Sequence, residues 1–142
     1  MKLKPESPTF AIAVGVFYTD GRFLVSRRKQ GAHCGGTWEF PGGKQKNGES
    51  IEEALRREVE EETGLQFREG LLAHREEYSY RDRTVTLHFF LCLGACNEPQ
   101  EREGQELSWV TLQELEQLEI PAGNRGFLKV LREQFGDVPK EL

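Results

Sequence analysis

Residues 43–65 read GKQKNGESIEEALRREVEEETGL, and this stretch decides the expected fold because it specifies one helix between two loops. Ser50, with Glu53 three positions later, forms a capping-box pattern at the helix start, and Gly64 supplies a C-terminal stop. Apolar residues recur at helical spacing and mark the face that we expect to pack on a core: Ile51, Ala54, Leu55 and Val59. The stretch therefore predicts a helix over residues 51–63.

This helix is strongly acidic, because it carries six glutamates and only two arginines. Glu58, Glu61 and Glu62 are three and four positions apart, so their carboxylates share one face and repel one another. Glu61 and Glu62 also lie in the last turn, where the helix dipole disfavours anions. A divalent cation such as Mg²⁺ relieves both penalties, since it prefers carboxylate oxygen. The alternative is a solvated acidic face, which the carboxylates taken alone favour.

Extended segments lie on both sides of the helix. We expect strands over residues 10–18 and 22–26, joined by a tight turn at Asp20-Gly21. The other expected elements are a loop over 27–36, an extended piece over 38–40, a hairpin of strands over 71–80 and 84–93, a short strand at 109–110, and helices over 111–118 and 124–135. This order predicts an α/β domain with a mixed sheet and helices packed on its faces.

Length and composition narrow the class of protein. The chain has 142 residues, which fits a single domain over 1–142, with a folded core over about 8–135 and a short C-terminal tail. The net charge of −5 argues against polymeric DNA or RNA as a partner. No apolar stretch near the N-terminus is long enough to span a membrane, so we expect a cytoplasmic protein. The three cysteines include no CxxC pair, which argues against a disulfide framework or a zinc site.

A longer pattern includes the acidic helix. The chain matches the signature GX5EX7REUXEEXGU, in which U is aliphatic, at every fixed position. Gly43 is followed after five residues by Glu49, and Glu49 is followed after seven residues by Arg57-Glu58-Val59-Glu60-Glu61-Glu62-Thr63-Gly64-Leu65. The chain thereby resembles the Nudix hydrolase family, whose members hydrolyse a nucleoside diphosphate linked to another group. The resemblance implies a Nudix-type α/β/α sandwich with a mixed β-sheet and a loop-helix-loop motif.

The resemblance also implies a set of metal ligands. Glu58 and Glu62 correspond to the core Mg²⁺ ligands, with Glu61 nearby; Mn²⁺ is expected to substitute for Mg²⁺. A backbone carbonyl of the Gly42-Gly43 pair completes the site, and Glu103 aligns with a loop carboxylate near the metals. Arg57 has two readings, either a bidentate pair with Glu49 that orients the ligands or an ordinary i,i+4 pair with Glu61.

Within the Nudix family the chain is most similar to the MutT branch, which removes oxidised guanine nucleotides from the precursor pool. The similarity rests on five local patterns outside the motif: Ala11-Ile12-Ala13-Val14-Gly15, Arg27-Arg28, Trp38-Glu39-Phe40-Pro41-Gly42-Gly43-Lys44, Asp82-Arg83 and Pro121-Ala122-Gly123-Asn124. It implies that the nucleotide is contacted by Arg28, His33, Glu39, Phe40, Pro41, Gly42 and Asn124. Arg83 is a further candidate contact to phosphate or base.

Each of these residues also has an ordinary structural reading. Asn124 offers an amide that can read a purine edge, but asparagine is also a favoured helix N-cap. Arg28 and Arg83 are equally compatible with exposed surface positions. A loop histidine such as His33 is often only solvated, and aromatic residues beside a short strand, such as Phe40, usually serve the core.

The expected activity is Mg²⁺-dependent hydrolysis of 8-oxo-dGTP to 8-oxo-dGMP and pyrophosphate by a monomer. By resemblance, water attacks the β-phosphorus, and Glu58 or Glu103 removes its proton. A relative acting on CTP, dCTP or a nucleoside diphosphate sugar would share the metal motif and differ in the base pocket, with Asn124 as the discriminating residue. A catalytically silent nucleotide-sensing module is a third reading, although such modules usually lose motif carboxylates.

Overall fold

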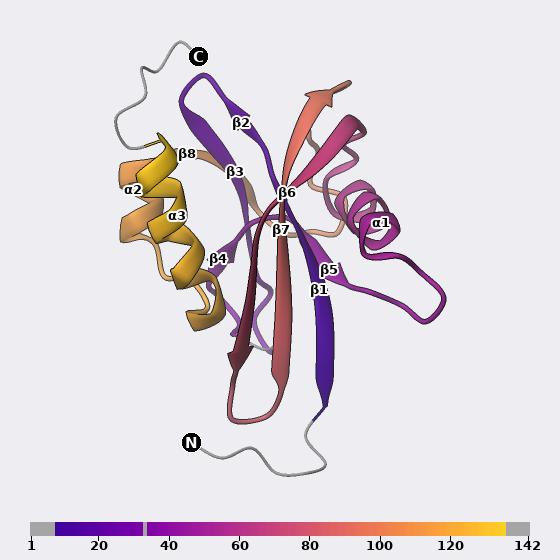
Figure 1. Ribbon diagram of the computed structural model, residues 1–142. Helices are drawn as coiled ribbons and strands as arrows, with labels where there is room; N and C mark the ends of the chain where they lie inside the picture. The colour runs from indigo at the N-terminus through magenta and orange to yellow at the C-terminus, as the bar shows by residue number, and fades with distance from the viewer. Residues whose placement is uncertain (1–7, 33, 136–142) are drawn as a thin grey trace.

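The computed structural model describes residues 8–32 and 34–135, which form two sheets and three α-helices (Figure 1). In chain order the elements are β1 (Thr9–Val16), β2 (Tyr18–Thr19), β3 (Arg22–Arg27), β4 (Trp38–Glu39), β5 (Gly42–Lys44), α1 (Ile51–Thr63), β6 (Phe67–Ser79), β7 (Thr84–Ala95), β8 (Leu107–Thr111), α2 (Leu112–Gln117), the 3-10 helix η1 (Ala122–Asn124) and α3 (Arg125–Phe135). None of the helices in the described ranges is long and apolar enough to cross a membrane.

The expected mixed sheet is confirmed, and a second sheet accompanies it. The first sheet has the order β5-β1-β7-β6, in which β1 and β7 are parallel and the other pairs antiparallel. The second is antiparallel and centres on β3, which pairs with β2, β4 and β8. The prediction of a single strand over 10–18 was wrong, because the chain leaves the first sheet at the buried Phe17 and joins the second as β2.

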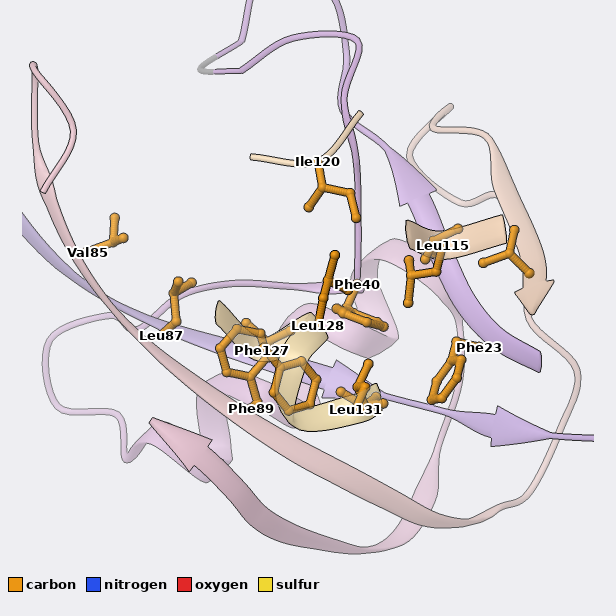
Figure 2. Packing of buried hydrophobic residues seen from close by; sticks show 14 residues of the cluster. Phe23, Phe40, Val85, Leu87, Phe89, Leu115, Ile120, Phe127, Leu128 and Leu131 are labelled. Carbon is orange, nitrogen blue, oxygen red and sulfur yellow. The ribbon is translucent and has the colours of Figure 1, made fainter. Parts of the chain in front are cut away.

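Helices cover the two sides of this arrangement, which confirms the α/β/α layering. Figure 1 shows α1 on one side of the sheets and α2 with α3 on the other. Alternation along β1 sends side chains to two cores: Ala13 packs with the apolar face of α1, whereas Val14 and Val16 pack toward α3. In the second of these cores the rings of Phe89 and Phe127 stack with centroids 4.1 Å apart (Figure 2).

Local turn and cap chemistry fixes the ends of the elements as expected. Ser50 and Glu53 form a complete capping box on α1, and Gly64 ends the helix in the left-handed conformation at φ 73°. Asp20 and Gly21 both have positive φ, as the tight turn between β2 and β3 requires.

Other boundaries differ from the expectation. The hairpin is longer, with strands over 67–79 and 84–95, because backbone pairing continues past the alternating residues. The short strand expected at 109–110 spans 107–111, since it pairs along β3. The last helix agrees with the expectation of a start near Asn124, since it spans Arg125–Phe135 and Asn124 ends the 3-10 turn just before it.

Candidate active site

A cavity of about 310 Å³ opens beside the first sheet and reaches the acidic helix. Its volume lies in the range of small-molecule sites. Its lining comes from eight parts of the chain: Phe10, Ile12 and Val14 of β1; Arg28; Glu39 and Phe40; Gly42, Gly43 and Lys44 of β5; Glu58 of α1; Tyr80 and Arg83; Val85 and Leu87 of β7; and Pro121 and Asn124. The cavity is therefore apolar along the sheet and carries ionisable groups around it.

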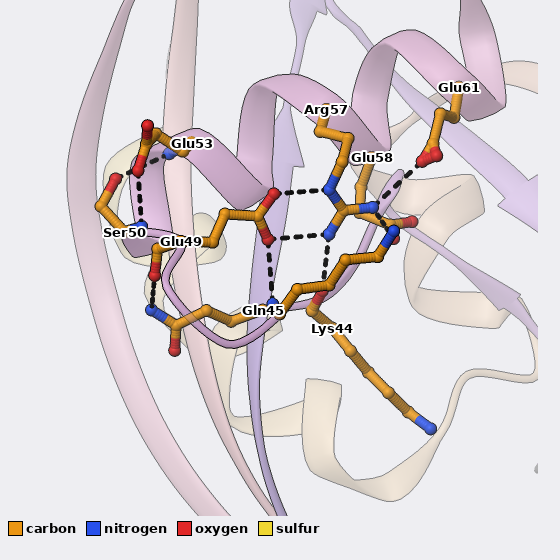
Figure 3. Close-up of polar contacts among 9 residues, drawn as sticks. Lys44, Gln45, Glu49, Ser50, Glu53, Arg57, Glu58 and Glu61 are labelled. Carbon is orange, nitrogen blue, oxygen red and sulfur yellow. Dashed lines mark hydrogen bonds and ion pairs between the residues drawn. The ribbon is translucent and has the colours of Figure 1, made fainter.

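The Arg57 side chain of α1 makes polar contacts with several residues of the helix and of the segment before it (Figure 3). Its Nε and Nη2 donate to the two carboxylate oxygens of Glu49 at 2.5 and 2.9 Å. Its Nη1 donates to Glu58 at 2.7 Å and to Glu61 at 3.0 Å, and Nη2 also donates to the Lys44 carbonyl at 2.9 Å. The structure therefore shows both contacts expected for Arg57, the bidentate pair with Glu49 and the i,i+4 pair with Glu61. The guanidinium ties the loop before α1 to two carboxylates of the helix.

Glu58 lies directly against the glycine pair at the start of the motif. A Cβ atom on Gly43 would overlap the Glu58 carboxyl group, and one on Gly42 would overlap the Ala13 carbonyl oxygen. Only glycine can therefore bring the backbone this close to the helix. Burial raises the pKa of Glu58, while Arg57 acts in the opposite direction.

Glu62 is the most buried carboxylate of the helix, at 5% exposure. The fully buried Ser26 of β3 donates its hydroxyl hydrogen to one carboxylate oxygen of Glu62. The Gly42 N–H points at the other oxygen from 3.4 Å. Burial raises the pKa of Glu62 to about 7, and the hydrogen bond from Ser26 opposes this shift. The carboxylate is thus held in place by two separate strands.

The donor chemistry of the helix fits a hard divalent cation. The negative charge of Glu103 raises the pKa of both Glu58 and Glu62, so a carboxylate from a second segment acts on two carboxylates of the helix. Glu61 lies further out, with 43% of its side chain exposed. Within residues 8–32 and 34–135 no three acidic, histidine or cysteine side chains converge closely enough to form a ready-made metal cage. The oxygen ligands suit Mg²⁺, which keeps several waters and needs few protein ligands.

The same cavity is lined by several of the residues expected to contact the nucleotide. Arg28 donates to Glu39 at 2.7 Å, and both side chains line the cavity. Asn124 is 5% exposed and lines it too. Burial raises the pKa of Glu39, and the facing guanidinium of Arg28 opposes that rise.

The other residues predicted to contact the nucleotide differ in where they lie. Phe40 belongs to the core and also lines the cavity, so its two readings coexist. Pro41 is buried, and its carbonyl accepts a hydrogen bond from the Gly15 N–H at 2.8 Å. Arg83 lines the cavity and donates to Asp82. His33 lies outside the described residues.

The structure adds residues that sequence reasoning missed. Ser26 reads as an ordinary strand residue, and its contact with Glu62 joins positions 36 apart. Tyr80 lines the cavity, as does Phe10, whose ring has the Lys44 ammonium 4.1 Å from its centroid. The only available signal for Tyr80 was its position, two residues before the Asp82-Arg83 pattern.

Comparisons with known proteins agree with this site. A family model described as the NUDIX domain matches residues 13–130. The chain is 35% identical over 122 residues to the 8-oxo-dGTP diphosphatase of Escherichia coli K12, covering 85% of this chain and 95% of that protein. It is 32% identical over 105 residues to the CTP pyrophosphohydrolase of the same organism, covering 72% and 76%. The solved MutT protein of Methanosarcina mazei superposes with a TM-score of 0.81 at 28% identity, covering 92% of this chain and 98% of that one.

Proposed function

This chain belongs to the Nudix hydrolase family, and from that premise we propose that it hydrolyses 8-oxo-dGTP to 8-oxo-dGMP and pyrophosphate with the help of Mg²⁺. The observation that carries the proposal is the shared cavity. Glu58 and Gly43 of the metal motif line this cavity, and so does Asn124. A single ligand can therefore meet carboxylate chemistry and base recognition at the same time.

The proposed metal ligands are Glu58 and Glu62, with Glu61 and Glu103 close by and a backbone carbonyl of Gly42 or Gly43. Bound Mg²⁺, or Mn²⁺ in its place, would neutralise the triphosphate and lower the pKa of a bound water. This explains how a chain of net charge −5 accepts an anionic substrate.

The reaction requires a base and well-oriented carboxylates. The oxygen of a water molecule forms a bond to the β-phosphorus, the bond from that phosphorus to the α–β bridging oxygen breaks, and pyrophosphate and 8-oxo-dGMP result. Glu58 or Glu103 takes the proton of the water. Arg57 acts by holding Glu49, Glu58 and Glu61, and its planar fork makes contacts that a lysine could not copy.

The nucleotide is proposed to lie along the apolar wall of the cavity. Asn124 would read the purine edge, which changes its hydrogen-bonding character when C8 is oxidised. Arg28 and Arg83 would meet phosphate or ribose oxygens, and the segment Glu39 to Gly42 would border the base together with His33. The apolar side chains of β1 and β7 supply the surface on which the base rests.

The setting we propose follows from this chemistry. The protein acts as a monomer with a single domain over 1–142, in the cytoplasm, on a small nucleoside triphosphate rather than on polymeric nucleic acid or a membrane. By removing an oxidised precursor it would keep the lesion out of newly replicated DNA.

A second candidate function is CTP or dCTP hydrolysis. The observation that favours it is the 32% identity to a CTP pyrophosphohydrolase. The two candidates differ at the base end of the cavity, so comparison of nucleotides separates them.

The test is pyrophosphate release by the Glu58→Gln variant. We expect turnover of 8-oxo-dGTP to fall by at least about two orders of magnitude while the protein stays folded. Glu52→Gln, which removes one charge from the exposed first turn of the same helix, is the matched control and should retain activity. Near-normal turnover by Glu58→Gln would contradict the proposed site.

A further inference from the structure

Tyr80 connects two segments that are far apart in the sequence. It lies in the turn after β6, where its N–H donates to the Arg83 carbonyl at 2.7 Å. Its hydroxyl oxygen accepts a hydrogen bond from the Gly123 N–H at 2.6 Å. The second contact spans 43 positions and joins the hairpin to the 3-10 turn η1 that ends in Asn124.

The η1 turn packs directly on the hairpin. A Cβ atom on Gly123 would come within 3.0 Å of the Tyr80 hydroxyl oxygen and 3.2 Å of a Leu87 methyl carbon. The turn also has an internal bond, from the Asn124 N–H to the Pro121 carbonyl at 2.9 Å. A second internal bond runs from the Arg125 N–H to the Ala122 carbonyl, so the backbone around Asn124 is held by these two bonds and by the bond to Tyr80.

Tyr80, Pro121 and Asn124 all line the same cavity. The Tyr80 hydroxyl bonds the residue immediately before Asn124, so a shift of that bond moves the Asn124 backbone and the amide that it carries. Glu58 reaches the cavity from α1, which is a different element. A change at Tyr80 should therefore alter base recognition and leave the phosphate chemistry in place.

We propose that Tyr80 is a positioning residue that holds the Asn124 amide at the angle needed to read a purine base. The proposal rests on the proposed function, because it assigns the purine-reading role to Asn124. It identifies Tyr80 as a determinant of selectivity between purine and pyrimidine nucleotides.

The test removes one oxygen atom in the variant Tyr80→Phe. Loss of one neutral hydrogen bond predicts a rise of about five-fold in KM for 8-oxo-dGTP, with kcat within about two-fold of wild type and KM for CTP unchanged. Tyr78→Phe is the matched control, since it removes a hydroxyl from the neighbouring ring, whose centroid lies 4.8 Å from that of Tyr80. Tyr78→Phe should leave kcat and KM unchanged for both 8-oxo-dGTP and CTP.

A double-mutant cycle decides whether Tyr80 acts through Asn124. In the Asn124→Ala background, Tyr80→Phe should have no further effect on KM, because the amide that it positions is gone. Kinetics are measured well below the unfolding midpoint of each variant, so that loss of stability is not mistaken for loss of recognition. An unchanged KM in Tyr80→Phe, or the same rise in both backgrounds, would overturn the role of Tyr80.

The proposed function fails in a different way. It fails if the wild-type protein releases no pyrophosphate from any nucleotide or prefers CTP. The role of Tyr80 is judged from each variant against wild type on the same nucleotide, and an effect on CTP equal to that on 8-oxo-dGTP would contradict it.

Discussion

Glu62 should give the metal-free protein a stability that depends on pH. Its pKa is raised by burial from 4.5 to about 7, so the native state holds a proton that the unfolded chain releases at lower pH. The contribution of Glu62 to the free energy of unfolding is therefore fully present below about pH 4.5 and is lost as the pH rises through about 7. The difference between the two pKa values corresponds to about 3 kcal/mol in the free energy of unfolding.

The perturbation is Glu62→Gln, which cannot titrate. Between about pH 4.5 and about pH 8 the wild-type free energy of unfolding, minus that of the variant, should fall by about 3 kcal/mol. The partly buried Glu39 and Glu58 have raised pKa values that act in the same direction, whereas the lowered pKa of His88 acts in the opposite direction. Glu58 and His88 are present in both proteins and cancel in the difference, which therefore reports Glu62 together with its coupling to the nearby Glu39.

The assay is urea unfolding in EDTA, followed by the fluorescence of Trp38 and Trp109 at several pH values. Glu52→Gln controls for the loss of one negative charge on the same helix. Parallel pH curves for wild type and Glu62→Gln would refute the reasoning, because they would show that Glu62 is not desolvated in the native protein.

Three further perturbations test other parts of the site. Arg57→Lys should lower kcat/KM by about 10- to 100-fold, since lysine lacks the fork that bonds Glu49 at two points, and an unchanged Mg²⁺ titration of activity would count against this. Gly43→Ala should abolish pyrophosphate release by displacing Glu58, whereas Gly48→Ala, which strains a φ of 83° but whose Cβ meets no atom within 4 Å, should cost stability and remain active. Addition of excess EDTA should stop turnover, and Mg²⁺ should restore it; activity that survives chelation would exclude the metal role.

Local sequence signals predicted the elements that depend on neighbouring residues. The helix over 51–63 was predicted correctly because the residues that form its two caps and its apolar face are close together in the sequence. The turn at Asp20-Gly21 was found because few residue pairs tolerate positive φ there. The division into two sheets was missed, since β1 pairs in parallel with β7, about 75 positions later, and no local pattern encodes such pairing.

The candidate site shows the same division between local and distant information. The signature identified the acidic helix, and the structure places Glu58 against Gly43 as a loop-helix-loop motif requires. The contacts that orient these groups come from distant strands, as Ser26 does for Glu62. Asn124 was expected either to cap a helix or to face a ligand, and its place in a 3-10 turn depends on packing against the hairpin. Burial and partner contacts of this kind follow from tertiary structure alone.

The proposed substrate is tested by measuring pyrophosphate release by the wild-type protein from 8-oxo-dGTP, dGTP and CTP, each with Mg²⁺. Asn124 and Glu58 line one cavity, and the chain is 35% identical to an 8-oxo-dGTP diphosphatase, so we expect the highest kcat/KM for 8-oxo-dGTP. A higher kcat/KM for CTP than for 8-oxo-dGTP would contradict the proposed substrate.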